Sequence, residues 1–185
     1  MSGVDSMEIR KSKYIHDFYN GIIEGDGVQS YGKVYKDIAF AYENKDEKIS
    51  CDTEMYKVYH FDEGGENALL WGLTLLHPIL VNGECNFTRG HFHSDRTEPE
   101  IYFGLGGDGL LLYMDDNNEC FAEEVFKGSV HYINGKYAHR LVNTGDVDLK
   151  VGACWRKVAG HDYVSTDKNI FPKRIYKIDG EIKIK

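Results

Sequence analysis

Short runs of alternating apolar and polar residues follow one another from residue 54 onward. EMYKVYHF (54–61) alternates as a half-buried strand does, and ALLWGLTLL (68–76) is a denser apolar run typical of a buried strand. Further short apolar runs follow up to residue 155, separated by turn signals such as GGDG, DDNN, NGK and NTGD. No helix of convincing length is predicted between Glu54 and Tyr163. This pattern predicts an all-β sandwich or barrel.

The two ends of the chain carry weaker patterns. GIIEGDGV (21–28) indicates loops with short extended pieces, and YENKDEK (42–48) indicates either a solvated loop or a short surface helix. IYKIDGEIKI (175–184) alternates on both sides of Asp-Gly, which predicts a hairpin. We therefore expect a single domain over residues 1–185, with a few short helices. Its parts would be an irregular N-terminal arm (1–53), a core (54–163) and a C-terminal hairpin (164–185).

Composition and charge narrow the partners and the compartment. The net charge of -8 argues against nucleic acid, whereas a small phosphorylated ligand needs only a local cluster of donors. We find no secretory signal and no apolar run long enough to span a membrane. The four cysteines form no CxxC pair. We therefore expect reduced thiols in a cytoplasmic protein.

The segment TRGHFHSDRTEPEIY (88–102) contains candidate metal ligands. His91 and His93 would project to the same face of a strand, and a hairpin to the next strand would bring Glu100 alongside them. His139, in YAHRLVN, begins a later strand. An isolated HxH pair is usually an ordinary surface or core pair, but this larger set suits Fe, Mn, Ni, Co or Zn with open positions for substrate. Four other histidines have no recognisable partner and are interpreted as ordinary: His16, His60, His77 and His131.

The order of these residues resembles the cupin superfamily. Its first motif corresponds to His91, His93, Glu100 and Gly107, and its second to residues 128–143, which include His139 and Asn143. The second motif lacks its usual proline and reads NGKYAH, but Asn-Gly can turn the chain without proline. The resemblance implies a cupin β-sandwich or barrel, also described as a double-stranded β-helix.

A longer gap between the second histidine and the glutamate makes the match more specific. TRGHFHSDRTEPEIY, KYAHRLVN and AGHDY, together with DFYNGIIEGDG, EMYKVY and LTLLHP, are similar to the metal-dependent, cupin-type glucose-6-phosphate isomerases of archaea and some bacteria. The resemblance implies an aldose–ketose isomerase, an intramolecular oxidoreductase, that interconverts glucose 6-phosphate and fructose 6-phosphate in glycolysis and gluconeogenesis. It further implies a homodimer with one divalent metal per subunit, Fe(II) being expected ahead of Mn(II), Ni(II) or Zn(II). The implied ligands are His91, His93, Glu100 and His139.

Three residues are candidates for catalysis. Glu100 could act as the base of an enediol route, although a hydride shift without a carbon base stays an alternative. His161 could move oxygen protons or open the sugar ring, or it could simply pack in a turn beside Asp162. Tyr102 shares the inward face with Glu100, where it could hydrogen-bond an oxygen or fill the barrel.

A substrate phosphate would need hydrogen-bond donors. Thr88, Arg89 and Gly90 directly precede the ligand histidines and offer a hydroxyl, a guanidinium and an unhindered backbone N–H. Lysine is common in the family at the place of Arg89. The resemblance adds Tyr56, Thr74 and Tyr163 as phosphate contacts, with plain strand packing as the alternative for the first two.

Other functions stay open at this stage. The same ligands would serve another metal cupin, such as an Fe dioxygenase, but Thr88 to Gly90 favour an anionic substrate. A mannose-6-phosphate isomerase or epimerase is the nearest alternative, and a non-catalytic sugar-phosphate-binding protein is the most distant. The chain departs from the family at Trp155, which stands where a tyrosine is common. An indole N–H donates but does not titrate usefully, so we expect no proton transfer there.

Overall fold

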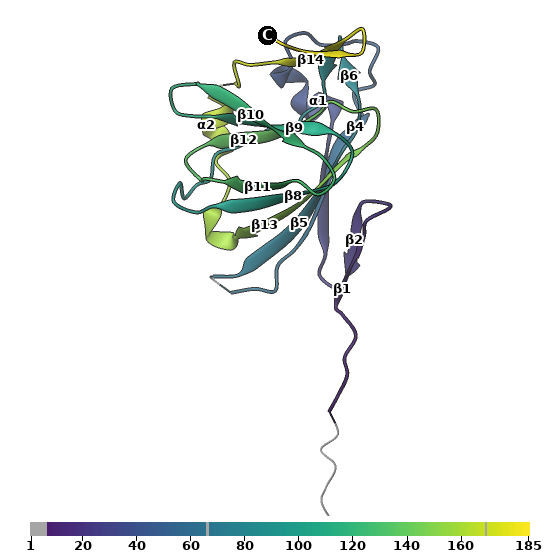
Figure 1. Cartoon of the computed structure of the whole chain (residues 1–185), viewed down its shortest axis with the longest axis vertical. Coiled ribbons are helices and arrows are strands. Elements are labelled where there is room, and N and C mark those ends of the chain that lie inside the picture. The colour runs from purple at the N-terminus through teal and green to yellow at the C-terminus, as the bar shows by residue number, and fades with distance from the viewer. Residues whose placement is uncertain (1–6, 66, 169) are drawn as a thin grey trace, which may run out of the picture.

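Two antiparallel sheets packed face to face form the body of the protein (Figure 1). The computed structural model describes residues 7–65, 67–168 and 170–185. Residues 1–6 of the expected arm lie outside this part. The larger sheet consists, in spatial order, of β11 (Val130–Ile133), β8 (Glu100–Gly106), β13 (Leu149–Arg156), β5 (Leu69–Leu76), β4 (Glu54–Phe61) and β3 (Gln29–Val34). The smaller sheet consists of β10 (Cys120–Val125), β9 (Gly109–Met114) and β12 (Ala138–Asn143).

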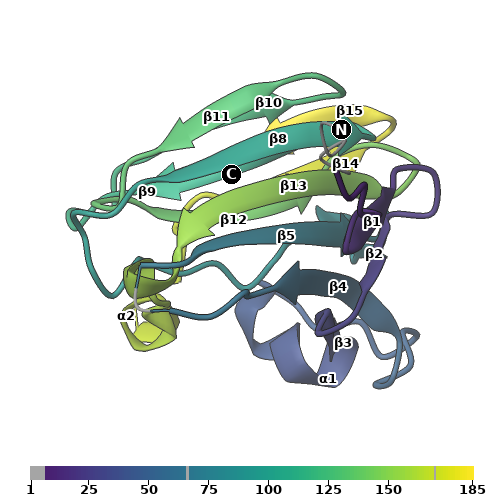
Figure 2. The ribbon, with the colours of Figure 1, turned by 90° about the horizontal axis from the view of Figure 1, so that it is seen from below.

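Side chains that alternate along each strand fill the space between the two sheets. In the larger sheet, β5 and β13 run side by side (Figure 2). On β5, Leu76 is fully buried in the core, whereas Leu70 and Thr74 on the same face line a cavity. Leu111 and Leu141, paired across β9 and β12, close the core from the smaller sheet. One end of the sandwich is therefore packed, and the other end is hollow. The predicted all-β sandwich with short helices is confirmed.

The expected N-terminal arm contains regular pieces. β1 (Tyr14–Asp17) and β2 (Ile22–Gly25) form a hairpin, and Tyr14 stacks on Phe61 of β4 with ring centroids 3.8 Å apart. β3 joins the larger sheet as an edge strand, and α1 (Tyr35–Ile38) and the 3-10 helix η1 (Ala39–Ala41) follow it. Residues 42–48 form the loop, not the helix, of the two alternatives.

The C-terminal hairpin is present as predicted. β14 (Ile175–Ile178) pairs with β15 (Glu181–Ile184), and Asp179 and Gly180 both have positive φ, as a type I′ turn requires. β14 also pairs with β7 (Glu84–Cys85), which pairs with β6 (Leu80–Val81). The remaining helices are η2 (Lys157–Ala159) and α2 (Tyr163–Lys168). Within the described ranges, no helix has the length and apolar character needed to cross a bilayer.

Candidate active site

Four side chains that could bind a metal ion meet between the two sheets. Their candidate ligand atoms all lie within 4.8 Å of one another. We call them the donor set: His91, His93, Glu100 and His139. The structure therefore brings together the four residues that the sequence suggested as ligands. Three imidazoles and one carboxylate suit a divalent transition metal, and a four-donor set leaves coordination positions for a substrate.

Backbone pairing places these donors. His91 and His139 form an isolated antiparallel bridge, in which each N–H donates to the other residue's carbonyl, at 3.2 and 3.0 Å. Phe92 forms a second bridge with Asp162. Residues 94–99 then cross to the larger sheet, where Glu100 opens β8. The predicted hairpin between the histidines and Glu100 was wrong, because the histidine segment pairs with β12 and reaches Glu100 across the sandwich.

The hydrogen bonds of the donor set fit a bound cation. His93 Nδ1 lies 2.7 Å from the Glu98 carbonyl oxygen, which can only accept, so Nδ1 carries the proton. In the neutral ring, the Nε2 lone pair then faces the Glu100 carboxylate at 3.2 Å, which is also an acceptor. The buried Nε2 atoms of His91 and His139 make no well-formed hydrogen bond among the described residues, and that of His139 lies 3.3 Å from the Glu100 carboxylate. A divalent metal would satisfy all four acceptors at once.

Burial and charge favour the metal-binding protonation states of two of these donors, His91 and Glu100. Burial, together with the neighbouring imidazoles, holds the pKa of His91 well below its usual range, so its ring is neutral. Burial opposes ionisation of Glu100, but its close contacts with the His139 and His93 imidazoles lower its pKa overall. A neutral imidazole and an ionised carboxylate are the forms that bind metals.

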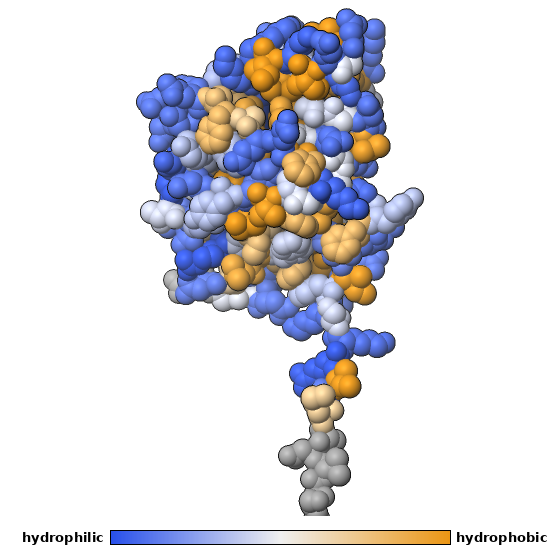
Figure 3. Space-filling view, viewed as in Figure 1, coloured by the Kyte–Doolittle hydropathy of each residue, from blue (hydrophilic) through white to orange (hydrophobic). Residues whose placement is uncertain are grey.

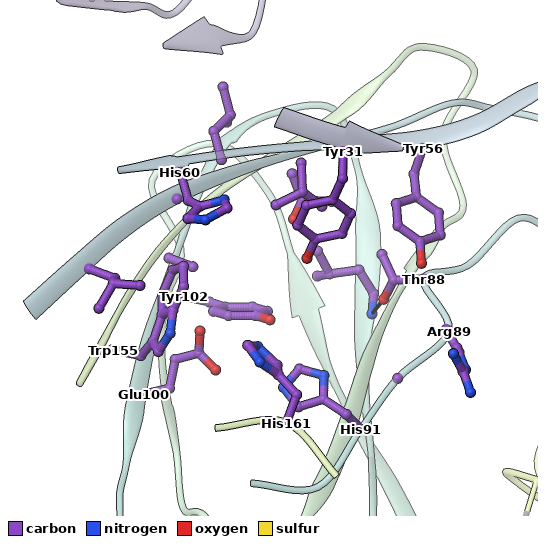
Figure 4. Close-up of a pocket in the computed structure, with 18 of the residues that line it drawn as sticks. Tyr31, Tyr56, His60, Thr88, Arg89, His91, Glu100, Tyr102, Trp155 and His161 are labelled. Atoms are coloured by element: carbon purple, nitrogen blue, oxygen red, sulfur yellow. Dashed lines mark hydrogen bonds between the residues drawn. The ribbon is translucent and has the colours of Figure 1, made fainter. Parts of the chain in front are cut away.

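A cavity of about 500 Å³ opens from the donor set (Figure 4). Figure 4 shows Glu100, Trp155 and His60 gathered at one end, and Tyr56, Thr88 and Arg89 at the other. Ten of the twelve predicted site residues line this cavity; the other two, His93 and His139, are buried and do not line it. The lining residues that were predicted are Tyr56, Thr74, Thr88, Arg89, Gly90, His91, Glu100, Tyr102, His161 and Tyr163.

The Thr88–Gly90 segment supplies donors at the second end. The Thr88 hydroxyl oxygen accepts a hydrogen bond from the Leu141 N–H at 3.0 Å, which leaves its own proton to donate elsewhere. Arg89 is engaged by Asp167 of α2 through two hydrogen bonds, one of them from Nε at 3.0 Å, and its guanidinium lies 4.7 Å from the Tyr163 ring. Gly90 has φ +77 and lies against the His139 carbonyl, so this position has no room for a side chain.

His161 and Tyr102 both lie beside the donor set. The His161 ring centroid is 4.4 Å from that of His91, and desolvation lowers its pKa. Asp162 instead caps Ser165 through its carboxylate, so packing against Asp162 does not account for the position of His161. Tyr102 meets the His139 ring edge-on at 5.6 Å, and burial raises its pKa well above the usual range. Tyr102 can therefore donate a proton in a hydrogen bond but does not ionise.

Sequence reasoning missed several lining residues. Tyr31, Lys33 and His60 reach the cavity from β3 and β4, and no motif included these three residues. Their only sequence signal is the alternation that places 31 and 33 on one face. Trp155, singled out as a departure from the family, lines the cavity with its ring 6.4 Å from His161.

Two histidines interpreted as having no partner do have partners. His77 contacts Asp148 through Nδ1 at 2.8 Å and Glu54 through Nε2 at 3.2 Å. His131 contacts Glu123 at 2.6 Å and Ser129 at 2.9 Å. The contacts of His77 join residues that are far apart in the chain, and no spacing pattern marks Glu123 as the partner of His131. The sequence could therefore not reveal either pairing.

Comparison with known proteins identifies the family of the chain. The sequence profile of the glucose-6-phosphate isomerase (GPI) family matches residues 29–184. A glucose-6-phosphate isomerase from Thermococcus kodakarensis is 36% identical over 139 residues, covering 75% of this chain and 74% of that protein. Another, from Pyrococcus furiosus, is 31% identical over 172 residues, covering 91% and 90%. Among solved structures, oxalate decarboxylase from Bacillus subtilis is similar with a TM-score of 0.46 and 18% identity, over 57% of this chain and 26% of that one. Because the profile spans most of the sequence and both isomerases are identical to it at about a third of the aligned positions, the chain belongs to the glucose-6-phosphate isomerase family.

Proposed function

We propose that the chain catalyses the interconversion of glucose 6-phosphate and fructose 6-phosphate. One observation carries the proposal: a single cavity joins the donor set to the Thr88–Gly90 segment. Isomerisation of a sugar phosphate needs a reacting end, where C1 and C2 are held, and a distant end that binds the phosphate. A dioxygenase would need the first end only, so the combination favours the isomerase.

A divalent metal held by the donor set would supply a Lewis acid that polarises the substrate carbonyl. Glu100 is the base that takes a proton from one carbon and returns it to the other. His161, at the cavity wall, moves the proton between the two oxygens and assists ring opening. Tyr102 donates a hydrogen bond that orients the substrate.

The substrate phosphate binds at the second end of the cavity. Thr88, Arg89 and Gly90 donate to it, and the hydroxyls of Tyr56, Thr74 and Tyr163 complete the contacts. In support, all six residues line the same cavity. Figure 4 shows the hydroxyl groups of Tyr56 and Thr88 on the same side of that cavity.

A coupled assay of fructose 6-phosphate conversion tests the activity. We expect chelator-stripped protein to be inactive and to recover with Fe(II) more than with Mn(II), Ni(II) or Zn(II), since mixed imidazole and carboxylate donors suit iron. Glu100→Ala should stay inactive with every metal, whereas Glu124→Ala, an exposed position on β10, should behave as the wild type. Absence of isomerisation in every metal-loaded wild-type sample would refute the proposal.

An isotope experiment tests the role of Glu100. Glucose 6-phosphate deuterated at C2 should lose its label to water if a carboxylate carries the proton, because that proton exchanges with solvent. A hydride shift would instead carry the deuterium intact to C1 of fructose 6-phosphate. Complete retention of the label would therefore rule out Glu100 as the carbon base.

We also propose that the protein is a homodimer in which the whole chain acts as one cupin unit. Two cross-strand pairs on β8 and β11 expose apolar rings and branches: Phe103 with Val130, and Ile101 with Tyr132. Figure 3 shows apolar side chains gathered in the middle of the face that carries these strands. A contiguous apolar patch of this kind is typical of an interface. Sedimentation should give a dimer for the wild type and a monomer for Tyr132→Lys; a monomeric wild type would refute the assembly.

The proposed setting is the cytoplasm, in glycolysis or gluconeogenesis. All four cysteines, which lie within the described ranges, are free thiols, as a reducing compartment favours. Fractionation of cells with an antibody to the chain tests this placement, and recovery outside the cytoplasmic fraction would contradict it.

A further inference from the structure

The cavity has three cationic lining residues, and two of them are already neutralised. Lys157 pairs with Asp62 at 2.7 Å, and Arg89 makes a two-bond pair with Asp167. Lys33 is the third, and it forms no ion pair with any residue that the structure describes. A cation held by a carboxylate contributes little net positive potential to a neighbouring anion.

Strand register places Lys33 at the phosphate end of the cavity. β3 and β4 are antiparallel, and Lys33 lies directly opposite Tyr56. Opposed residues on one face have Cβ atoms about 5 Å apart. The pairing register shifts directly after Lys33, between Lys33 and Val34, and such bulges redirect side chains near functional sites. Tyr56 lies beside Thr88 in Figure 4, so Lys33 borders the same end.

The electrostatics of the chain favour such a cation. A sugar phosphate carries up to two negative charges, while the chain has a net charge of -8 and Glu100 already places a carboxylate in the cavity. The charge of Arg89 is shared with Asp167, and the other donors at that end are uncharged hydroxyls and backbone N–H groups. A lysine ammonium is a compact point charge on a flexible stem that suits phosphate.

We propose that Lys33 is a phosphate-binding residue of this site. It supplies a positive charge that no carboxylate in the described part of the chain neutralises, whereas Asp167 neutralises the charge of Arg89. The proposal rests on the proposed isomerase function and adds a residue that no motif of the chain marks. Because Lys33 lies away from the donor set, it would bind substrate and transition state equally. Its loss should therefore raise KM and leave kcat nearly unchanged.

Steady-state kinetics on metal-loaded protein test the proposal. For Lys33→Gln we expect KM for fructose 6-phosphate to rise about tenfold or more, the scale of a lost charge-assisted hydrogen bond. The inhibition constant of inorganic phosphate should rise with it, which reports anion binding separately from turnover. Lys33→Arg should recover most of the affinity, because it keeps the charge.

A matched control removes the same charge outside the cavity. Lys36→Gln lies three residues further along, where Lys36 pairs with Asp52 at 2.7 Å on the surface, and should change KM less than twofold. Equal KM values for wild type and Lys33→Gln, with both proteins folded by thermal melting, would refute the role of Lys33. An inactive wild type would instead refute the isomerase function, and titration of inorganic phosphate into both proteins would then still test Lys33 by itself.

Discussion

Replacing Gly135 by alanine would disturb the donor set through a single hydrogen bond. Gly135 lies in the turn before β12, against the loop that leads into β8. An alanine Cβ there would lie 2.3 Å from the Glu98 carbonyl oxygen and 2.8 Å from that of Arg96, although real Cβ atoms essentially never approach within 3.0 Å. The same Glu98 oxygen accepts the His93 Nδ1 proton. The loop cannot move away from the added Cβ without displacing the Glu98 carbonyl oxygen, which is the hydrogen-bond partner that orients His93.

The cost has two parts. The Glu98 carbonyl must move by about 0.7 Å, and overpacking of this size in a buried site destabilises a protein by about 1–3 kcal/mol. Loss of the partner that orients a metal-binding imidazole typically weakens metal affinity about 10–100-fold. Gly135→Ala should therefore lose metal before it loses its fold.

Competition with a chromophoric chelator would measure Zn(II) affinity, and urea unfolding would measure stability. Gly106→Ala is the matched control, because its added Cβ would meet only the Lys150 side chain, at 4.0 Å. We expect weakened zinc binding in Gly135→Ala and almost none of this effect in the control. Unchanged zinc affinity in a destabilised Gly135→Ala protein would show that the Glu98 contact does not orient His93.

Two further predictions concern charged contacts. Asp167→Asn should release Arg89 toward the phosphate and lower KM for fructose 6-phosphate about two- to fivefold, the scale of a partly exposed ion pair; a higher KM would mean that Asp167 holds Arg89 in its binding position. His77 should stabilise the fold in acid: desolvation lowers its pKa, but the hydrogen bonds and charges of Asp148 and Glu54 raise it overall. Its contribution is thus complete below about pH 6.5 and lost as pH rises through the raised value, so urea midpoints of wild type and His77→Gln should differ more at about pH 6 than at about pH 8. A gap that widens toward alkaline pH would contradict this reasoning.

The sequence allowed the local features of the site to be predicted. Alternation alone places His91 and His93 on one face and Glu100 and Tyr102 on another, because a strand has a period of two. The Asp179-Gly180 turn likewise has one favoured geometry. The order of motifs then added His139, which alternation alone does not link to the others. These predictions depend on short-range backbone geometry or on a recognised motif.

The contacts that sequence reasoning missed depend on sheet order. Lys33 and His60 reach the cavity only because β3 and β4 extend the larger sheet at its far edge. Asp167 meets Arg89 across 78 positions of the chain. A hydrophobic pattern specifies which face of a strand is buried but not which strand lies beside it. The partners of these charged residues therefore became visible only in three dimensions.

The donor set draws its members from both layers of the sandwich. Glu100 belongs to the larger sheet, His139 to the smaller, and His91 is bonded to His139 through the backbone. An ion bound by all of them would link the two layers. The supply of that ion would therefore determine how well the folded protein resists heat and proteolysis. At free metal one hundredfold above its dissociation constant, the gain is about 2.7 kcal/mol. A cell starved of that metal would then lose the protein itself as well as its activity.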